Sequence, residues 1–249
     1  GGRRGGAALA AVRGWVWRLA QEVHGCRRVQ ELFDEAADDE RRALAAELVG
    51  HVWEAAQCPQ ANFVLQKAVT VMRSEDVQFI IDELPAARAA KHKTACRVVQ
   101  RLIEQCPPEQ LTRMLCSIEE DFSNVARSPY GNYVVQRMIE YGAQDQRLRV
   151  MHLVVQDVKG LSADPFGSAV LSGALVKGPA SGQALLARAL VQEPGLLAFL
   201  ACTRHGSTSV LKALQVLTPE ERAEAQTALS EHAPVLMASR FGRAVAHKL

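Results

Sequence analysis

The sequence lacks a bulk charge, a long apolar run and a secretion signal, and each absence narrows the class of protein. Its 29 Lys and Arg residues nearly balance 27 Asp and Glu residues, which leaves a net charge of +2. Binding to a nucleic acid would therefore depend on a local groove and not on the field of the whole protein. No apolar run reaches the roughly 18 residues of a membrane span, and no segment has the pattern of a signal peptide. We expect an intracellular protein that makes no contact with a membrane.

Motifs of catalytic and metal sites are also missing. The six cysteines form no CxxC pair and have no histidine at zinc-ligand spacing, which favours reduced, largely buried thiols and no metal site. No histidine lies in a nucleophile, HExxH or phosphate-loop context. Carboxylate pairs such as Asp38-Asp39 and Glu119-Glu120 lie where solvated helix ends are expected. We therefore expect no enzyme and no cofactor.

Most of the sequence has the composition and the apolar spacing of helices. Residues 1–6, Gly-Gly-Arg-Arg-Gly-Gly, are of low complexity and predict a disordered tail. From about Ala7 onward, Ala, Leu, Glu, Arg and Gln are frequent, apolar residues recur every three or four positions, and strand-like alternation is absent. Pro108, Pro219 and the segment Ser74-Glu75-Asp76 each predict the first turn of a helix. An all-α protein is expected.

A short pattern recurs along the chain and organises it. Its reference residue, called i below, falls at positions 26, 62, 96, 132, 168, 207 and 243, which are 36, 34, 36, 36, 39 and 36 residues apart. A period of this length has room for two or three helices and is typical of a helical solenoid, in which each layer buries its apolar face against the next. The sequence predicts seven such repeats.

Two positions of the pattern predict the core between repeats. The residues at i+3 and i+7 are apolar wherever the chain supplies them, and burial of each should contribute roughly 1.5 to 3 kcal/mol. They are Val29 and Phe33, Leu65 and Val69, Val99 and Ile103, Val135 and Ile139, Leu171 and Leu175, and Val210 and Leu214. A small residue precedes i in every repeat, as at Gly131, which predicts a tight turn or close packing there.

Three other positions of the first four repeats carry side chains that a core does not require. On a helix, i and i+4 share a face and i+1 lies beside them. A planar group at i+1 in four successive repeats can stack on unpaired bases, and the amides at i and i+4 can hydrogen-bond base edges. The residues at i and i+4 are Cys26 and Gln30, Asn62 and Gln66, Cys96 and Gln100, and Asn132 and Gln136. The residues at i+1 are Arg27, Phe63, Arg97 and Tyr133.

These segments resemble the PUF, or Pumilio-like, family of RNA-binding helical repeat proteins. The closest is Gly131-Asn132-Tyr133-Val134-Val135-Gln136, and the resemblance has motif quality from about His24 to Glu140. It implies a right-handed α-solenoid, a curved superhelix of about seven tri-helical repeats of roughly 36 residues. It also implies that each repeat binds one base of single-stranded RNA on the concave face.

The resemblance further implies a base for each of the first four repeats. Repeats with Cys at i and Gln at i+4 would bind adenine, and those with Asn and Gln would bind uracil. The family binds RNA antiparallel to the repeats, so the implied element is 5′-UAUA-3′ with Asn132 and Gln136 at its 5′ uracil. From the residues alone, Asn can donate to a uracil carbonyl, and the small Cys leaves room for adenine.

The last three repeats depart from the pattern although their core positions persist. Ala169, Thr208 and Ala244 replace the planar group, and the terminal Gln is lost. We expect one repeat domain over residues 7–249, well formed to about residue 142 and degenerate over 143–249. The chain ends at i+6 of the seventh repeat, so either it is a fragment or this repeat frays. The weak candidates for RNA contact in this region are Ser168, Ser172, Ser207, Thr208, Arg243 and His247.

Alternatives remain open. An armadillo-like or HEAT-like scaffold for protein partners explains the period and the core equally well, but not the repeated side chains at i+1 and i+4. A divergent PUF-like protein of ribosome biogenesis, which would bind RNA with little base specificity and be nucleolar, is favoured by the degenerate repeats. The leading prediction is a cytoplasmic, monomeric regulator of mRNA. By resemblance it would bind 3′ untranslated regions and recruit co-regulators on its convex face.

Overall fold

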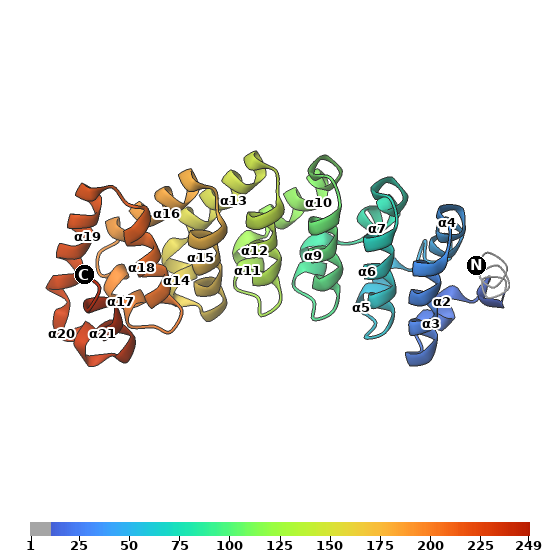
Figure 1. Cartoon of the computed structure of the whole chain (residues 1–249), viewed down its shortest axis with the longest axis horizontal. Helices are drawn as coiled ribbons and strands as arrows, with labels where there is room; N and C mark the ends of the chain where they lie inside the picture. Colours follow the sequence, from blue (N-terminus) through green and yellow to red (C-terminus); the bar gives the residue numbers. More distant parts are fainter. Residues whose placement is uncertain (1–10) are drawn as a thin grey trace. The chain divides into compact units, whose positions relative to one another are not determined.

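A computed structural model describes residues 11–249, and every regular element in this range is a helix (Figure 1). The tail predicted to be disordered, residues 1–6, and the first residues of the expected repeat domain lie outside the described range. The chain divides into two compact parts, up to Glu120 and from Asp121 to Leu249, which we call the N-terminal and C-terminal parts. Three complete repeats fall in the first part, and the other four lie in the second.

Each of the first six repeats has a first, a middle and a third helix, and the seventh has two helices among the described residues. The first helices are α2 (Val16–Ala20), α5 (Val52–Gln57), α8 (Ala86–Ala90), α11 (Phe122–Ala126), α14 (Val158–Ala163), α17 (Leu196–Ala201) and α20 (Ala233–Ala238). The middle helices are α3 (Val23–Glu35), α6 (Ala61–Val71), α9 (Ala95–Gln105), α12 (Gly131–Tyr141), α15 (Pro165–Lys177), α18 (Gly206–Val216) and α21 (Arg240–Ala246). The third helices are α4 (Asp38–Ala46), α7 (Gln78–Glu83), α10 (Pro108–Glu120), α13 (Gln144–Gln156), α16 (Ala180–Gln192) and α19 (Pro219–Glu231).

Two of the three predicted helix starts are confirmed. Pro108 and Pro219 are the first residues of α10 and α19, as expected for a residue that needs no hydrogen bond to its nitrogen. At the third predicted start, Ser74–Val77 forms a 3-10 helix and not the first turn of an α-helix. The short α7 follows it directly. Leu84, just before Pro85, adopts an extended ψ of 118°, as the steric demand of a following proline requires, and this ends α7 after six residues.

The predicted core is confirmed at every position. The side chains at i+3 and i+7 are all buried, and Val29, Leu65, Val135, Leu171 and Val210 have no exposed surface. The middle helices α3, α6 and α9 pack in order within the N-terminal part, and α12, α15, α18 and α21 do so within the C-terminal part (Figure 1). One apolar stripe of every middle helix is therefore part of the core of each part.

Close packing explains the small residue ahead of i. A Cβ added at Gly131 or Gly206 would fall on the backbone carbonyl of the preceding first helix, at Val125 or Leu200. A collision with backbone cannot be relieved by a rotamer change, so only glycine, which has no Cβ, fits at these two positions. The first and middle helices of a repeat approach each other most closely there.

An arginine that binds backbone carbonyls ties successive repeats together near the C-terminal ends of the middle helices. We call Arg41 and Arg147 the joint arginines. Arg41 donates to the carbonyls of Phe33 (2.8 Å) and Val71 (3.1 Å), which end the middle helices of repeats 1 and 2. Arg147 does the same for Ile139 (2.6 Å) and Lys177 (2.8 Å) in repeats 4 and 5. Helix ends leave carbonyls without intrahelical donors, and one guanidinium satisfies two of them at once.

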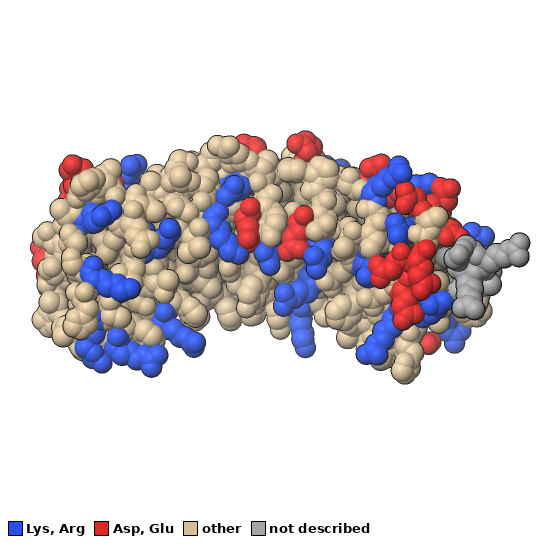
Figure 2. All heavy atoms as spheres, in the orientation of Figure 1, with Lys and Arg blue, Asp and Glu red and all other residues tan. Residues whose placement is uncertain are grey.

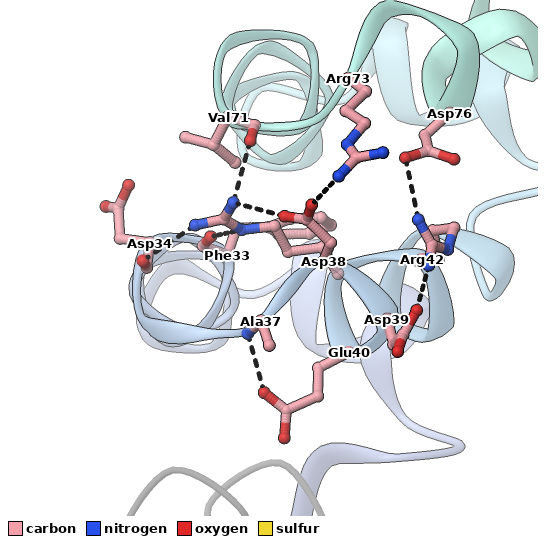
Figure 3. A network of polar contacts seen from close by, with 11 residues as sticks. Phe33, Asp34, Ala37, Asp38, Asp39, Glu40, Arg42, Val71, Arg73 and Asp76 are labelled. Atoms are coloured by element: carbon pink, nitrogen blue, oxygen red, sulfur yellow. Dashed lines mark hydrogen bonds and ion pairs between the residues drawn. The ribbon is translucent and has the colours of Figure 1, made fainter. Parts of the chain in front are cut away.

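Ion pairs surround the first of these joints (Figure 3). Asp38 pairs with Arg73 at 3.0 Å, and Arg42 reaches both Asp39 and, at 3.4 Å, Asp76 of the next repeat. Asp38 and Asp39 thus occupy the first turn of α4, the helix end that the sequence predicted, where carboxylates also favour the helix dipole. They stabilise the contact between repeats 1 and 2.

Candidate nucleic-acid interface

The middle helices of repeats 1 to 4 present their three candidate positions in the same way. The residue at i is buried, the residue at i+1 is exposed, and the one at i+4 lies between them in exposure or is buried. Phe63 and Tyr133 keep 52% and 50% of their surface exposed, which is unusual for an aromatic ring in a packed helix. The exposed rings and guanidinium groups can therefore receive a planar ligand without unfolding the core.

The two asparagines at i are hydrogen-bonded on every side. Nδ2 of Asn132 donates to the carbonyls of Ser128 (3.0 Å) and Pro129 (3.2 Å), and its Oδ1 accepts from Nε2 of Gln136 at 3.2 Å. Asn62 repeats the arrangement with Cys58, Pro59 and Gln66. The expected donation from Asn to a uracil carbonyl is thus not available in this conformation, because both amide protons already have acceptors in the preceding turn. The asparagine instead orients the glutamine at i+4.

The two cysteine repeats differ from each other in their glutamines. Nε2 of Gln30 donates to the carbonyl and the sulfur of Cys26, at 3.2 and 3.1 Å. Gln100 is only 6% exposed, and its Nε2 has no hydrogen-bond partner among the described residues. Burial raises the pKa of both the Cys26 and the Cys96 thiol above the ordinary value, so both sulfurs are neutral at physiological pH. Each offers a small apolar surface beside its glutamine.

A cleft of about 550 Å³ separates the middle helices of repeats 2 and 3. Phe63, Asn62 and Gln66 line it from α6, and Arg97 lines it from α9. The lining of the cleft therefore combines the planar groups at i+1 of repeats 2 and 3 with the two amides, at i and i+4, of repeat 2. Such a slot suits one flat, hydrogen-bonding ligand of the size of a nucleobase.

The turns ahead of the middle helices complete this cleft, and the sequence pattern did not single them out. Pro59, His92, Lys93 and Thr94 belong to these turns and line the cleft. Oγ1 of Thr94 donates toward the carbonyls of Ala56 (2.9 Å) and Gln57 (3.0 Å), which ties the turn of repeat 3 to repeat 2. Lys93 stands three residues before i and is exposed. The positions i, i+1 and i+4 do not include it, although a cation so close to them is visible in the sequence.

The weak candidates of repeats 5 to 7 lie at the equivalent positions without forming an equivalent site. Ser168 and Ser207 are buried, Ser172 is half-buried, and Thr208, Arg243 and His247 are exposed. No aromatic ring or guanidinium stands at i+1 in these repeats. Repeat 5 still serves repeat 4, because Gly173 leaves room for Gln136, whose Cγ and Oε1 would lie 3.0 Å from an added Cβ.

Other classes of site find little support in the part of the chain that the structure describes. Residues 11–249 hold no group of three or more His, Cys, Asp or Glu side chains that could bind a metal ion. The six cysteines are free; three are buried, two are half-buried and Cys116 is exposed, so the expectation of buried thiols holds for only half of them. No helix within the described range is long and apolar enough to cross a membrane.

The pattern of repeats matches a family model. The model of the Pumilio-family RNA binding repeat matches residues 16–49, 51–84, 89–119, 122–155 and 198–224. The chain therefore belongs to the Pumilio (PUF) repeat family. The matched residues cover repeats 1 to 4 and most of repeat 6, and they leave out repeats 5 and 7.

Relatives carry the same repeats in longer proteins. Putative pumilio homolog 7, chloroplastic, of Arabidopsis thaliana is 28% identical over 131 residues, which are 50% of this chain and 20% of that protein. Pumilio homolog 12 of the same plant is 24% identical over 132 residues, 51% of this chain and 22% of that protein. The aligned segment is thus about half of this chain and no more than a quarter of these relatives.

Solved structures share the fold over nearly the whole chain. The crystal structure of PUF-8 in complex with PBE-RNA superposes with a TM-score of 0.90 at 23% identity, covering 99% of this chain and 74% of that one. The Puf3 RNA-binding domain, bound to a recognition sequence from the Cox17 RNA 3′ untranslated region, gives 0.85 at 19% identity, covering 99% and 77%. The fold is that of a PUF α-solenoid, as the sequence predicted.

Proposed function

We propose that this protein binds single-stranded RNA in a sequence-specific manner, one base per repeat in repeats 1 to 4. The proposed element is 5′-UAUA-3′, in which the pair Asn132 and Gln136 reads the first uracil, through the amide of Gln136 that Asn132 orients. Cys96 and Gln100 contact the first adenine, Asn62 and Gln66 the second uracil, and Cys26 and Gln30 the last adenine. Family membership favours this function over the armadillo-like or HEAT-like protein scaffold.

The observation that carries the proposal is the cleft between Phe63 and Arg97. Its lining includes the ring of Phe63 and the carboxamide of Gln66 on one middle helix and the guanidinium of Arg97 on the next. A base that enters the cleft gains stacking of roughly 1 to 3 kcal/mol and meets an amide that both donates and accepts. A flat protein-binding surface would have no use for a slot of this shape.

The unpartnered Nε2 of Gln100 gives independent support. A buried donor without an acceptor costs about 1 to 3 kcal/mol, and native proteins leave few such groups. An acceptor on the edge of a bound base would satisfy it, so the cost is recovered only in the complex. This donor therefore supports the assignment of Gln100 to a bound base.

The wider role follows as a part of the same proposal. Some PUF domains in the related structures are bound to 3′ untranslated sequences, which supports mRNA as the ligand and post-transcriptional or translational regulation as the outcome. The protein would act as a monomer and recruit co-regulators through its third helices. We place it in the cytoplasm, with the nucleolus as the alternative for a divergent member; two plant relatives are described as chloroplastic.

A change of specificity tests the base assignment. The substitution Asn62→Cys gives repeat 2 the same i and i+4 residues as repeats 1 and 3. We expect its preference at the third base of the element to move from uracil toward adenine, measured as binding of the full chain to UAUA and UAAA RNAs. Wild type should lose about fivefold or more when any one base is replaced by cytosine, since a mismatched base costs about 1 to 3 kcal/mol.

The control is Ser168→Cys, the same new side chain at i in repeat 5. It should leave every base preference unchanged. If wild type binds UAUA and CACA RNAs equally well, the proposed function is wrong, and selection from a random RNA pool should then enrich no motif.

A further inference from the structure

Cations one turn beyond the i+1 position have carboxylate partners in repeats 2 to 4. A residue at i+5 lies about 40° around the helix from i+1, so it shares the same exposed face. Lys67 pairs with Asp34, Arg101 with Glu104 and Arg137 with Glu140, each at 2.9 Å. The acidic partners stand at i+8 of the same or the preceding repeat. Their charges cancel most of the field that these cations would offer an anion.

Cations recur at i+5 in repeats 6 and 7. Lys212 and Lys248 stand at i+5, and the acidic i+8 position has become Val176 in repeat 5 and Gln215 in repeat 6. No ion pair links either lysine to a carboxylate among the described residues. The field of both lysines is therefore directed to solvent.

A second row of cations precedes the middle helices of these repeats. Arg204 and Arg240 both stand three residues before i and are exposed, Arg204 in the turn ahead of α18 and Arg240 at the first residue of α21. This is the position of Lys93, which lines the cleft of repeat 3. The guanidinium of Arg240 lies over the ring of Phe241, 4.5 Å from its centroid, and neither arginine has a carboxylate partner in the described chain.

Asp and Glu are absent from the chain segments that bear these four cations. Residues 194–218 and 232–249, which contain α17, α18, α20 and α21, include no Asp and no Glu. The acidic residues of repeat 6 are all on its third helix, α19. Figure 2 shows the result on one face, where blue spheres gather at the lower left over α18, α20 and α21, and red spheres lie at the upper edge.

A small cleft lies within this surface, between repeats 5 and 6. It has a volume of about 240 Å³, and its lining includes Ser168, Phe199, Arg204 and His205. Phe199 is on the first helix α17 and is 51% exposed, so it supplies the flat ring that the i+1 positions have lost. Asp164 also lines the cleft, but its Oδ1 accepts the amide protons of Phe166 and Gly167 and caps α15.

We infer that repeats 6 and 7 bind the sugar–phosphate backbone of the RNA on the 5′ side of the element, with little regard for base identity. Arg204, Arg240, Lys212 and Lys248 contact phosphates, and Phe199 packs against one nucleotide in the small cleft. Phosphate contacts position an RNA without carrying sequence information, which fits a surface with cations but no amide at i+4. The inference rests on the proposed function, because the antiparallel course of the RNA brings its 5′ side to these repeats.

Extended RNAs test the inference with the full chain. One RNA carries about six cytidines on the 5′ side of UAUA, and another carries them on the 3′ side. We expect the 5′ extension to bind about threefold or more tighter than the 3′ extension at low salt, and the difference to vanish at high salt. Equal affinities at every salt concentration would overturn the inference.

A charge-matched pair of variants localises the effect. The double variant Arg204→Gln/Arg240→Gln should abolish most of the gain from the 5′ extension and lower the slope of log K against log salt by about 1.4, from two lost phosphate contacts on a single strand. The control Arg13→Gln/Arg113→Gln removes two exposed cations from the N-terminal part and should leave the gain intact. An equal loss in both variants would show a general charge effect and not a surface on repeats 6 and 7.

The base-substituted RNA separates this inference from the proposed function. Replacement of UAUA by CACA within the 5′-extended RNA should lower affinity without changing the salt slope. If CACA binds as well as UAUA while the arginine variant still weakens binding, the base assignment fails and the backbone surface stands. If an acidic peptide, such as oligoglutamate, competes with the RNA extension as strongly as oligocytidylate does, the surface takes protein partners and the inference is wrong.

Discussion

Repeats 4 and 5 lie side by side in the C-terminal part and share a core but not a surface. At i+3, Val135 and Leu171 are both fully buried. At i+1 and i+4, repeat 4 has Tyr133 and Gln136, where repeat 5 has Ala169 and Ser172. The two sets of positions vary independently because the first is fixed by stacking of the repeats, whereas the second contributes little to that stacking.

The contrast extends to the charges of the exposed face. In repeats 2 to 4 a cation at i+5 pairs with a carboxylate of the protein, and a planar group and an amide lie on the same helix. In repeats 6 and 7 the planar group at i+1 is absent, and the lysines at i+5 have no carboxylate partner among the described residues. The loss of planar groups thus coincides with a gain of positive charge without an acidic partner.

The largest expected effect concerns the core that both groups of repeats share. Leu65→Ala in repeat 2 and Leu171→Ala in repeat 5 each empty a fully buried site, and each should lower the free energy of unfolding by about 2 to 5 kcal/mol. Urea denaturation of the two variants measures this. A cost below about 1 kcal/mol at Leu171 alone would show that the degenerate repeats are loosely packed. It would contradict the statement that the two groups of repeats share the same core.

The next effect concerns the surface that they do not share. The double variant Asn132→Ala/Gln136→Ala should weaken binding to a UAUA RNA by about 1 to 3 kcal/mol, since one base contact is lost. Ser168→Ala/Ser172→Ala, at the same positions of repeat 5, should change affinity less than twofold. Fluorescence anisotropy with both RNAs measures the pair, and similar losses in the two variants would place a base-specific site in repeat 5.

A smaller effect is expected at the joint between repeats 4 and 5. Arg147→Gln leaves the carbonyls of Ile139 and Lys177 without their charged donor and should cost about 1 to 2 kcal/mol in unfolding free energy. Arg149→Gln, two residues away, removes an exposed pair with Asp145 and should cost less than about 0.5 kcal/mol. If the two variants are equally stable, the joint arginine is not what holds these repeats together.

The last effect is confined to alkaline pH and concerns a thiol of the N-terminal part. Burial raises the pKa of Cys106 from 9.0 to about 11, so the folded protein keeps a proton that the unfolded chain releases. Stability from this group is complete below pH 9 and is lost as the pH rises toward 11, by at most about 1.4 kcal/mol per pH unit. The difference in stability between wild type and Cys106→Ala should therefore shrink over this window, whereas a constant difference would contradict the shift.

The periodic spacing of apolar residues was enough to predict the fold. It was not enough to predict the hydrogen bonds of the candidate site. The i+3 and i+7 positions were found because a solenoid repeats its core at fixed spacing, and Leu65 and Leu171 are buried as predicted. The hydrogen bonds of Asn132 could not be predicted, because its acceptors are carbonyls of a turn whose geometry no spacing rule encodes. The position of Phe199 could not be predicted either, because it lies on a first helix, outside the repeated pattern of the middle helices.

The sequence by itself determined the number and spacing of the repeats, the core stripe, and the four sets of side chains that the proposed RNA contacts use. These features are local or periodic, and helix geometry translates them directly into faces. Only the tertiary structure decided which amide protons are already occupied, that Gln100 keeps an unpartnered donor, and that Phe199, Arg204 and Ser168 meet at one cleft. Those facts depend on how closely helices of different repeats approach each other. The residue pattern within one helix does not specify the distance between two helices.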